Sequence, residues 1–355
     1  MPQGPNVAPN PPTRYLHAME LVTGATGSVG MHVVAELLRA GRPVRALRRA
    51  GSDSAPLEAF LARRSFSSAD LVWAEADLLD GDLLDAALAG CTRVYHCAAL
   101  VSFHPADARA LDRVNRAGTA ALVDAMLHAG VPECVYISSV AALGRRDGEP
   151  THEGTPFSEG PGVSAYARSK YAAELEVWRG GEEGLRVLSL LPSVVLGEGD
   201  FRRSSAELFA TVDRGLAFYP RGANGFVAAE DVARAALELP EIGAWGERYL
   251  LNAETWAYRE VFAAMADALG RPAPRFAVRP WMAGIAWRAA RVAEAFTGRK
   301  TLVTREALAN TDRHHDYASD RLAARFREAG KTWAYTPIAD TIRATATAYR
   351  AQFPD

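Results

Sequence analysis

Residues 21–30 read Leu-Val-Thr-Gly-Ala-Thr-Gly-Ser-Val-Gly, a segment with the pattern of a strand, a turn and the start of a helix. It begins as a buried strand and continues, after its last glycine, with the pattern of an amphipathic helix. Gly24, Gly27 and Gly30 give the turn the spacing G-x-x-G-x-x-G. Glycine permits a tight turn that a phosphate can approach closely, and the helix N-terminus offers N–H groups and a positive dipole end.

We therefore expect this turn to bind the pyrophosphate of a dinucleotide, although glycines in such a turn can also serve packing alone. The expected contacts from the turn are Gly24, Thr26, Gly27, Ser28, Val29 and Gly30.

Beyond this turn, short β-forming runs alternate with amphipathic stretches through the first half of the chain. The strands are expected at 20–23, 44–48, 71–74, 93–97, 134–138 and 185–190. The helices are expected at 29–40, 83–89, 106–129 and 165–179. This alternation is typical of a parallel sheet with helices on both faces, so we predict an α/β fold with a doubly wound sheet.

The alternation ends after Pro192, and the remaining sequence predicts a second, smaller and mostly helical unit. A helix after 225–233 and a strand at 248–251 are expected to return to the sheet. The proline-rich first residues lack the composition of a folded segment. We therefore divide the chain into a disordered tail at 1–18, a sheet domain at 19–195 with 224–252, and a substrate lobe at 196–223 and 253–355.

The composition is that of an ordinary globular protein and indicates a small-molecule partner. The chain has 355 residues, of which 49% are hydrophobic and 23% charged, and its net charge is -2. This charge gives no electrostatic basis for binding nucleic acid, and no apolar run reaches the ~18 residues that a membrane span needs. Three cysteines without a C-x-x-C pair fit a reducing compartment, so we expect a cytoplasmic protein, and we expect no metal site.

The end of the second strand indicates which nicotinamide cofactor is bound. An acidic residue there accepts hydrogen bonds from the adenosine ribose, whereas an arginine accommodates a 2′-phosphate. Arg48 and Arg49 stand at this place, and the first acidic residue after them is Asp53. The sequence therefore favours NADP over NAD, with two solvated surface cations as the alternative interpretation.

Two further places fit a dinucleotide. Asp77, just past the third strand, is expected either to accept from the adenine amino group or to cap the following turn. The small residues Ala98 and Ala99 follow the fourth strand and let a cofactor lie across the edge of the sheet, although strand packing also explains them.

Tyr166 and Lys170 stand four residues apart, so on a helix they share one face. A tyrosine has an unperturbed pKa of about 10, and a neighbouring ammonium favours its phenolate. Such pairs also arise by chance, but Ser139 follows the fifth strand, and a doubly wound sheet binds ligands beyond the carboxyl ends of its strands. We expect Ser139 to hold a substrate oxygen, Tyr166 to exchange its proton and Lys170 to tune Tyr166; a turn-capping role for Ser139 is the alternative.

Together these motifs resemble the extended short-chain dehydrogenases/reductases of the epimerase/dehydratase superfamily. The matching segments are 23–30, Asp77 with Leu78, 96–99, Val114 with Asn115, Ser138 with Ser139, Tyr166 with Lys170, and 191–195. The resemblance implies a Rossmann-type sheet domain in which Lys170 also bonds the nicotinamide ribose. It places Leu78, Asn115, Pro192 and Val195 among the cofactor-binding positions, with a structural role as the alternative for Asn115. It also implies a homodimer formed by the fourth helical region and the helix of Tyr166.

Neighbouring residues distinguish among the reactions of this superfamily. Its dehydratases carry an Asp-Glu pair after the active-site hydroxyl, whereas this chain has Val140 and Ala141. The stretch 190–195 resembles the dihydroflavonol-reductase and 3β-hydroxysteroid-dehydrogenase branch. We therefore expect an NADP-dependent oxidoreductase that transfers a hydride between nicotinamide and a carbonyl or secondary alcohol. Its expected substrate contacts are Phe103, Ser139, Tyr166 and Ser193.

The sequence of the lobe leaves alternatives open. Its aromatic residues favour a hydrophobic substrate and are Phe201, Phe218, Tyr219, Trp256, Trp281 and Trp287. Arg202, Arg203 and Arg221 would instead suit the diphosphate of a nucleotide sugar, as in an epimerase with tightly bound NAD. A non-catalytic cofactor-sensing protein is a third possibility, disfavoured because tyrosine and lysine are both present. The apolar run at 281–296 is expected to pack within the lobe rather than on a membrane surface.

Overall fold

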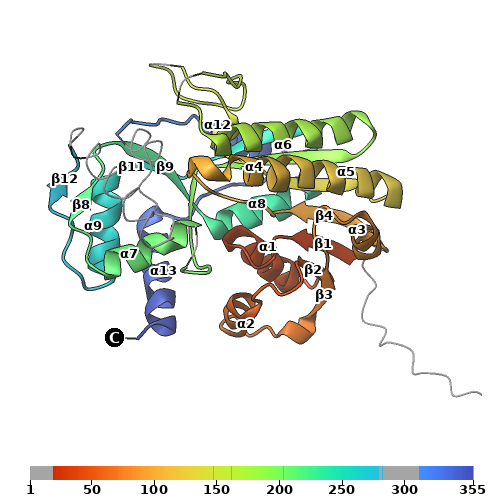
Figure 1. The fold of residues 1–355 in the computed structure, drawn as a ribbon, viewed down its shortest axis with the longest axis horizontal. Helices are drawn as coiled ribbons and strands as arrows, with labels where there is room; N and C mark the ends of the chain where they lie inside the picture. The colour runs from red at the N-terminus through yellow and green to blue at the C-terminus, as the bar shows by residue number, and fades with distance from the viewer. Residues whose placement is uncertain are drawn as a thin grey trace, which may run out of the picture.

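The computed structural model describes residues 19–279, 282 and 312–354, apart from positions 147, 161 and 203. A seven-stranded sheet forms its centre, and all of its strands run parallel (Figure 1). The strand order is β10-β6-β5-β4-β1-β2-β3. The strands are β1 Met19–Thr23, β2 Val44–Arg48, β3 Leu71–Glu75, β4 Cys91–His96, β5 Glu133–Ile137, β6 Arg186–Pro192 and β10 Glu247–Leu251.

Helices cover both faces of this sheet (Figure 1). One face packs against α1 Ser28–Arg39, α2 Ala55–Ala62, α8 Ala229–Glu241 and α12 Asp320–Glu328. The other face packs against α3 Gly81–Leu88, α5 Gly118–Ala129 and α6 Ala165–Glu182. Strands covered on both faces become continuous buried runs, and every residue of β5 is buried. The predicted doubly wound α/β fold is confirmed.

The order of the strands determines where a ligand can bind. The chain moves outward from β1 through β2 to β3, and then returns to β4 on the opposite side of β1. The connections that follow β1 and β4 therefore diverge, which leaves space at the carboxyl ends of these two strands. Ligands of open parallel sheets bind at this kind of switch point.

A smaller lobe adjoins this edge of the sheet (Figure 1). It contains a three-stranded sheet in the order β11-β9-β7 and a two-stranded ribbon of β12 and β8. Its strands are β7 Val194–Leu196, β8 Phe218–Tyr219, β9 Ala223–Ala228, β11 Glu254–Ala257 and β12 Phe276–Ala277. Its helices are α7 Glu207–Asp213, α9 Tyr258–Ala268 and α13 Ile338–Gln352, and they share one apolar core.

Two elements of the sheet domain differ from the sequence-based expectation. The helix α2 was not expected, because its eight residues are too few to show a clear period. The single helix expected at 106–129 is interrupted, and consists of η2 Pro105–Asp107, α4 Ala108–Leu111, the π-helical segment η3 Asp112–Ala117, and α5. Short 3-10 turns also occur at η1 Ser68–Asp70, η4 Val140–Ala142 and η5 Ser204–Ala206.

Several expectations lie outside the described residues: the tail at 1–18, Arg203, Trp281, Trp287 and most of the apolar run at 281–296. Within the described part of the chain, no helix combines the length and apolar character that crossing a bilayer requires.

Candidate active site

The glycine turn between β1 and α1 has the geometry of a phosphate-binding turn. Gly24 has a φ of 65°, and a Cβ there would lie 2.7 Å from Ala98, just past β4. A Cβ on Gly30 would lie 2.1 Å from the carbonyl oxygen of Gly24. No side chain caps α1 at Gly27, so the first N–H groups of the helix are available to an anion. The turn also contains the partly buried Thr26, Ser28 and Val29. These residues fit the pyrophosphate of a dinucleotide.

A segment that follows β7 closes over this turn. Ser28 donates to the carbonyl oxygen of Glu198 at 3.3 Å, and His32 hydrogen-bonds the same oxygen at 3.2 Å. The buried Glu198 carboxylate forms ion pairs with Arg63 and Arg64, which follow α2. This clamp joins the phosphate turn to the second part of the chain. No motif indicated it, because its members are scattered along the sequence.

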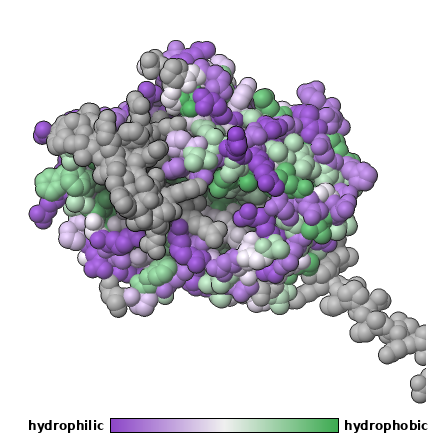
Figure 2. Space-filling view, in the orientation of Figure 1, coloured by the Kyte–Doolittle hydropathy of each residue, from purple (hydrophilic) through white to green (hydrophobic). Residues whose placement is uncertain are grey.

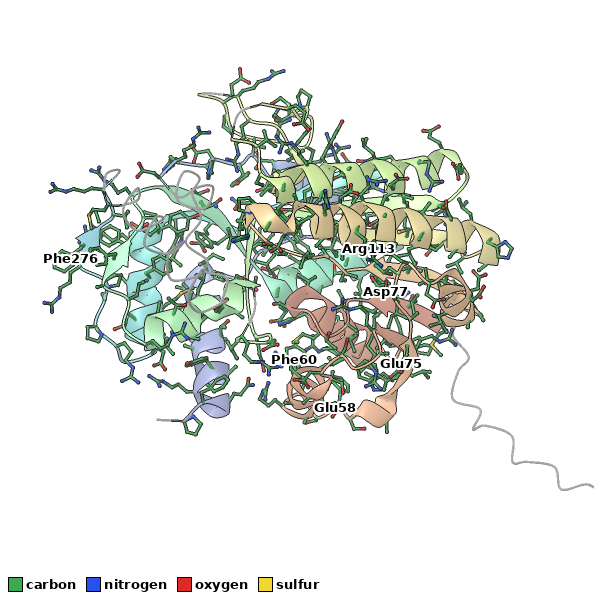
Figure 3. All side chains as sticks on the ribbon, viewed as in Figure 1. Glu58, Phe60, Glu75, Asp77, Arg113 and Phe276 are labelled. Atoms are coloured by element: carbon green, nitrogen blue, oxygen red, sulfur yellow. The ribbon has the colours of Figure 1, made fainter. Side chains whose placement is uncertain are left out.

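Arg48 ends β2, where the adenosine ribose of a dinucleotide is expected. Its guanidinium bonds Glu75 of β3 at 2.7 Å and lies 4.8 Å from the ring centroid of Trp73. Glu75 and Asp77 lie at the carboxyl end of β3 (Figure 3). Arg49 is exposed and forms no ion pair with any residue that the structure describes. The sheet therefore pairs Arg48 with Glu75, an acidic residue that is distant from it in the sequence.

The loop after β3 contains the two other positions expected at the adenosine end. Asp77 is exposed, and its carboxylate accepts from the N–H of Leu79 at 3.0 Å, which is the turn-capping arrangement. Leu78 packs toward α5, since a Cβ on Gly118 would lie 3.3 Å from its side chain. Contacts of Asp77 and Leu78 with adenine stay predictions.

A buried polar chain holds the ends of β1 and β4 together. Thr23 Oγ1 hydrogen-bonds His96 Nδ1 at 2.7 Å and accepts from the N–H of Ala98 at 3.2 Å. The other ring nitrogen, His96 Nε2, hydrogen-bonds Thr119 of α5 at 2.9 Å. Burial lowers the pKa of His96 to about 3, so its ring is neutral. His96 thus positions the loop of Ala98 and Ala99 against the phosphate turn.

The start of α6 brings Tyr166 to the end of β5. Ser164 caps the helix by accepting from the N–H of Ala167 at 3.0 Å, which places Tyr166 in the first turn. Ser139 Oγ accepts from the N–H of Ala141 at 3.1 Å and hydrogen-bonds the phenol of Tyr166. Burial raises the pKa of Tyr166, and the hydrogen bond from Ser139 partly offsets this rise. The structure therefore brings the two candidate hydroxyls together.

Lys170 lies one turn further along α6 and is buried. Its Nζ donates to the carbonyl oxygen of Ile137 at 2.8 Å and lies 4.3 Å from the ring centroid of Tyr136. Burial lowers the pKa of Lys170 to about 7. Ser139 is the direct partner of the Tyr166 phenol here, and the expected influence of Lys170 on that phenol stays a prediction.

Asn115 connects the loop after β4 to α6. Its Oδ1 accepts from the N–H of Leu100 at 2.7 Å, and its Nδ2 donates to the carbonyl oxygen of Leu100 at 3.0 Å. The same Nδ2 donates to Ser169 Oγ at 2.8 Å. The amide of Asn115 is thus engaged by the protein, which favours the structural alternative; a contact with the cofactor stays a prediction.

The residues that follow β6 and β10 carry two buried polar atoms, Ser193 Oγ and Asn252 Oδ1. Pro192 pairs with Leu251, and the N–H of Ser193 donates to the carbonyl oxygen of Leu251 at 2.9 Å. Ser193 Oγ and Asn252 Oδ1 are buried and have no hydrogen-bond partner among the described residues. Val195 is partly buried in β7. Ser193 and Asn252 can therefore serve a bound molecule; Asn252 was missed because a lone asparagine after a strand forms no motif.

Phe103 lies beside the candidate catalytic tyrosine. Its ring meets Tyr166 edge to face, with 5.6 Å between the centroids. Phe103 is 40% exposed and nearby Val101 is 49% exposed, although both are apolar. These side chains offer an apolar surface next to the Tyr166 phenol.

Several lobe residues have roles other than those expected. Phe201 is buried in the lobe core against Phe209 and Tyr349, so it does not line a pocket. Phe218 packs against Phe276, which Figure 3 places at the outer edge of the lobe. These aromatics pack within the lobe or at its edge because their strands and helices form its framework.

Arg202 also has a role other than the expected diphosphate contact, because carboxylates of the protein bind its guanidinium. It bonds Asp200 at 2.8 Å and Asp53 at 2.9 Å. It is therefore not available for a diphosphate in this arrangement. In the described ranges, no group of three or more His, Cys, Asp or Glu residues is arranged to hold a metal ion.

A doubly wound sheet with a glycine turn at its switch point, and with Ser139, Tyr166 and Lys170 beyond β5, defines the class of extended short-chain dehydrogenases/reductases. The sequence profile of the NAD dependent epimerase/dehydratase family matches residues 20–246, and the chain belongs to this family. It is thus an NAD(P)-dependent enzyme of the extended short-chain type.

Named relatives agree with this assignment. Sterol demethylase protein B of Methylococcus capsulatus is 35% identical over 75% of this chain and 79% of its own length. A putative dihydroflavonol 4-reductase of Synechocystis sp. is 31% identical over 74% of this chain and 75% of its own length. The crystal structure of gox2253 superposes with a TM-score of 0.75 at 31% identity, covering 95% of this chain and 99% of that chain.

Proposed function

We propose that the protein is an NADP-dependent oxidoreductase that interconverts a carbonyl group and a secondary alcohol on a hydrophobic small molecule. The hydrogen bond between Ser139 and Tyr166 at the end of β5 carries this proposal. Reduction of a carbonyl requires one group that binds the substrate oxygen and another that exchanges its proton. Two hydroxyls in contact, beside a phosphate-binding turn, supply both requirements.

In this mechanism, the Ser139 O–H turns from Tyr166 and donates a hydrogen bond to the substrate oxygen, and Tyr166 exchanges the proton with that oxygen. The turn from Gly24 to Gly30 would hold the dinucleotide, whose nicotinamide would supply or accept the hydride at the carbonyl carbon. Lys170, when charged, favours the phenolate of Tyr166 and so sets the pH at which this residue accepts a proton. Ser193 Oγ, which has no partner among the described residues, is placed for the nicotinamide end or the substrate.

The apolar surface of Phe103 and Val101 supports a hydrophobic substrate. The names of relatives point the same way, since they refer to a sterol, a dihydroflavonol and a 3-beta-hydroxysteroid. The engagement of Arg202 by Asp200 and Asp53 speaks against a nucleotide-sugar diphosphate at that position.

NADP is the proposed cofactor because Arg48 and Arg49 lie at the end of β2. Arg48 already bonds Glu75, so a 2′-phosphate would share or replace this carboxylate. The exposed Arg49 offers a second cation. We prefer NADP on this basis, with NAD as the alternative.

The proposed organisation follows the same reasoning. The division expected from the sequence is kept, with a cofactor domain at 19–195 and 224–252 and a substrate lobe at 196–223 and 253–355; β7 and β9 lie at its boundaries, and β9 pairs with β7 and with β11 of the lobe. We propose a homodimer through α4, α5 and α6, because Figure 2 shows apolar residues over this region and Leu175 of α6 is 50% exposed. A cytoplasmic location is proposed because the three cysteines are free.

The test is NADPH oxidation, followed by absorbance, against a panel of hydrophobic ketones, aldehydes and nucleotide-sugar ketones. We expect turnover with a hydrophobic carbonyl. Tyr166→Phe should lower kcat by about a hundredfold or more, because it removes the acid/base group and keeps the ring beside Phe103. The affinity for NADPH, measured by fluorescence titration, should be nearly unchanged.

Tyr171→Phe is the matched control, because Tyr171 lies on the same helix and stacks on Phe157 with 4.3 Å between the ring centroids. It should turn over like the wild type. Wild-type turnover by Tyr166→Phe would refute the assignment. Conversion of a nucleotide sugar without net change in NADPH absorbance would instead establish the epimerase alternative.

A further inference from the structure

Lys170 is buried, and its direct contacts carry no negative charge. Its Nζ contacts the carbonyl oxygen of Ile137 and the face of the Tyr136 ring. Removal from water disfavours an ammonium, and the pKa of Lys170 falls accordingly to about 7. Whether this lysine is charged near neutral pH therefore depends on the nearest anion.

Glu174 is that anion and lies one helical turn after Lys170, on the same face of α6. Its side chain is 3% exposed. One carboxylate oxygen accepts from Ser138 Oγ at 2.6 Å, and the other accepts from Trp178 Nε1 at 3.3 Å and from Arg248 at 3.4 Å. Both oxygens are thus held in place, and Glu174 acts on Lys170 through its charge.

The other titratable groups around Lys170 do not replace this charge. At the end of β4, burial keeps His96 neutral and raises the pKa of the thiol of Cys97, the residue that follows the strand, to about 12. From β5, burial raises the pKa of Tyr136 well above its ordinary value and that of Cys134 to about 12.

The remaining elements packed on α6 carry charged groups that pair elsewhere, together with neutral groups. From η3 and α5, Asp112 pairs with Arg116 and Asp124 pairs with Arg179, whereas Asn115 and Thr119 are uncharged. From β10, Arg248 is a cation that pairs with Glu174 itself. Glu174 is therefore the carboxylate that acts on Lys170.

We propose that Glu174 is a positioning residue that keeps Lys170 protonated and thereby sets the proton affinity of Tyr166. The claim about Lys170 stands on the fold alone. The consequence for Tyr166 rests on the proposed function.

The first test needs no substrate. The free energy of unfolding is measured in urea between about pH 5 and 9 for the wild type and Glu174→Gln, each with and without Lys170→Met. The difference in the free energy of unfolding between a protein and its Lys170→Met variant, followed against pH, reports the proton affinity of Lys170. The folded pKa of Lys170 lies below its unfolded pKa, so the unfolded chain binds the extra proton between the two values. The difference in the free energy of unfolding therefore begins to rise with pH at the folded pKa, and this pH is called the midpoint of Lys170.

We expect the midpoint of this difference to fall by about one pH unit in the Glu174→Gln background, a tenfold loss of proton affinity. Equal midpoints in both backgrounds would overturn the proposal. Glu174→Asp should keep the wild-type midpoint, because it keeps the charge.

Two controls separate charge from structure. Ser138→Ala removes a hydrogen bond to Glu174 and leaves the carboxylate, so its midpoint should match the wild type; a shift as large as that of Glu174→Gln would overturn the proposal. Glu176→Gln removes a carboxylate that pairs with Arg179 on the same helix, and should also leave the midpoint unchanged.

If Glu174→Gln alone fails to fold, the double variant with Lys170→Met decides. It removes both buried charges and should fold by circular dichroism, whereas failure of the double variant as well would refute a counter-charge role. With a substrate from the panel, Glu174→Gln should also move the pH limb of alcohol oxidation upward, because a neutral lysine no longer favours the Tyr166 phenolate. Should the panel yield no substrate, the unfolding measurements still decide the claim about Lys170.

Discussion

At the scale of single residues, Arg48 shows how a contact between strands changes the expected role of a side chain. The sequence places a cation at the end of the second strand, and the parallel pairing of β2 with β3 sets Arg48 opposite Glu75. The carboxylate holds the guanidinium at 2.7 Å, beside the ring of Trp73. Arg48 is therefore oriented before any phosphate arrives, but a phosphate has to compete with Glu75.

Arg48→Ala should weaken NADPH binding by about ten- to hundredfold, since a hydrogen bond to a charged phosphate contributes about 1.5–3 kcal/mol. NADH binding should change little, because NADH lacks the 2′-phosphate. Glu75→Gln should act in the opposite direction and favour NADPH. The measurement is fluorescence titration of both cofactors.

The control for this prediction is Arg39→Ala, which removes an exposed arginine paired with Glu36 at the end of α1. It should leave both affinities unchanged. An equal loss of NADPH and NADH affinity in Arg48→Ala would show that this residue does not read the 2′-phosphate.

At the scale of elements, the interrupted helix between β4 and β5 shows that a local hydrophobic period does not predict every change in helix winding. Residues 106–129 have helix-forming composition throughout, but the segment Asp112–Ala117 is wound as a π-helix. This segment contains Asn115, which bonds both Leu100 and Ser169. Because these partners come from other parts of the chain, no local pattern could predict the change of winding.

The turn between β1 and α1 has no room for a side chain at Gly30. Gly30→Ala should destabilise the protein by about 1–3 kcal/mol, because the new Cβ overlaps the backbone of Gly24. It should also abolish tight cofactor binding, since the turn must open to relieve the overlap. Urea unfolding and cofactor titration measure the two effects.

Gly81→Ala is the matched control for that substitution. Gly81 begins α3, and a Cβ there meets nothing within 4 Å. We expect its stability and cofactor affinity to match the wild type. If Gly30→Ala behaved like Gly81→Ala, the turn would not be as tight as the structure indicates.

At the scale of the whole molecule, stability depends on titratable groups enclosed by the two faces of the sheet and the lobe. Burial lowers the pKa of His32 and of His96 to about 3. Burial raises the pKa of Glu20 to about 7, although Arg42 and Arg93 oppose this rise. These groups lie in different regions, so their effects on unfolding should add.

The two histidines should make the protein less stable in acid. Their folded pKa is lower than their unfolded pKa, so the unfolded chain takes up protons first, and stability falls as the pH falls from about 6.5 toward 3. Each contributes up to about 1.4 kcal/mol per pH unit in this window. Glu20 acts oppositely, because its contribution is present at low pH and is lost as the pH rises toward 7.

Urea unfolding across this window should therefore show a net decrease in stability toward acid, since two histidines outweigh one glutamate. His96→Gln should reduce the slope of the unfolding free energy against pH by about 1.4 kcal/mol per pH unit, which corresponds to one proton. A variant with the wild-type slope would show that His96 is protonated in the folded protein.

Features that depend on local geometry could be predicted directly from the sequence. The glycine spacing from Gly24 to Gly30 requires a tight turn, and the alternation of strands with helices requires a parallel sheet with two covered faces. The four-residue step from Tyr166 to Lys170 places both on one helix face. Each of these depends on neighbours within a few residues, and therefore appears as a pattern along the chain.

Which charged and polar groups meet depends instead on contacts between distant parts of the chain. Arg48 meets Glu75 because β2 pairs with β3, and the carboxylate of Glu174 bonds Arg248 because β10 joins the sheet beside β6. The lobe closes on the phosphate turn through Glu198. Strand order and the packing of the lobe arise from the burial of the whole core, which no local period encodes. The sequence could therefore identify the candidate proton-transfer residues, but not the partners that set their charge.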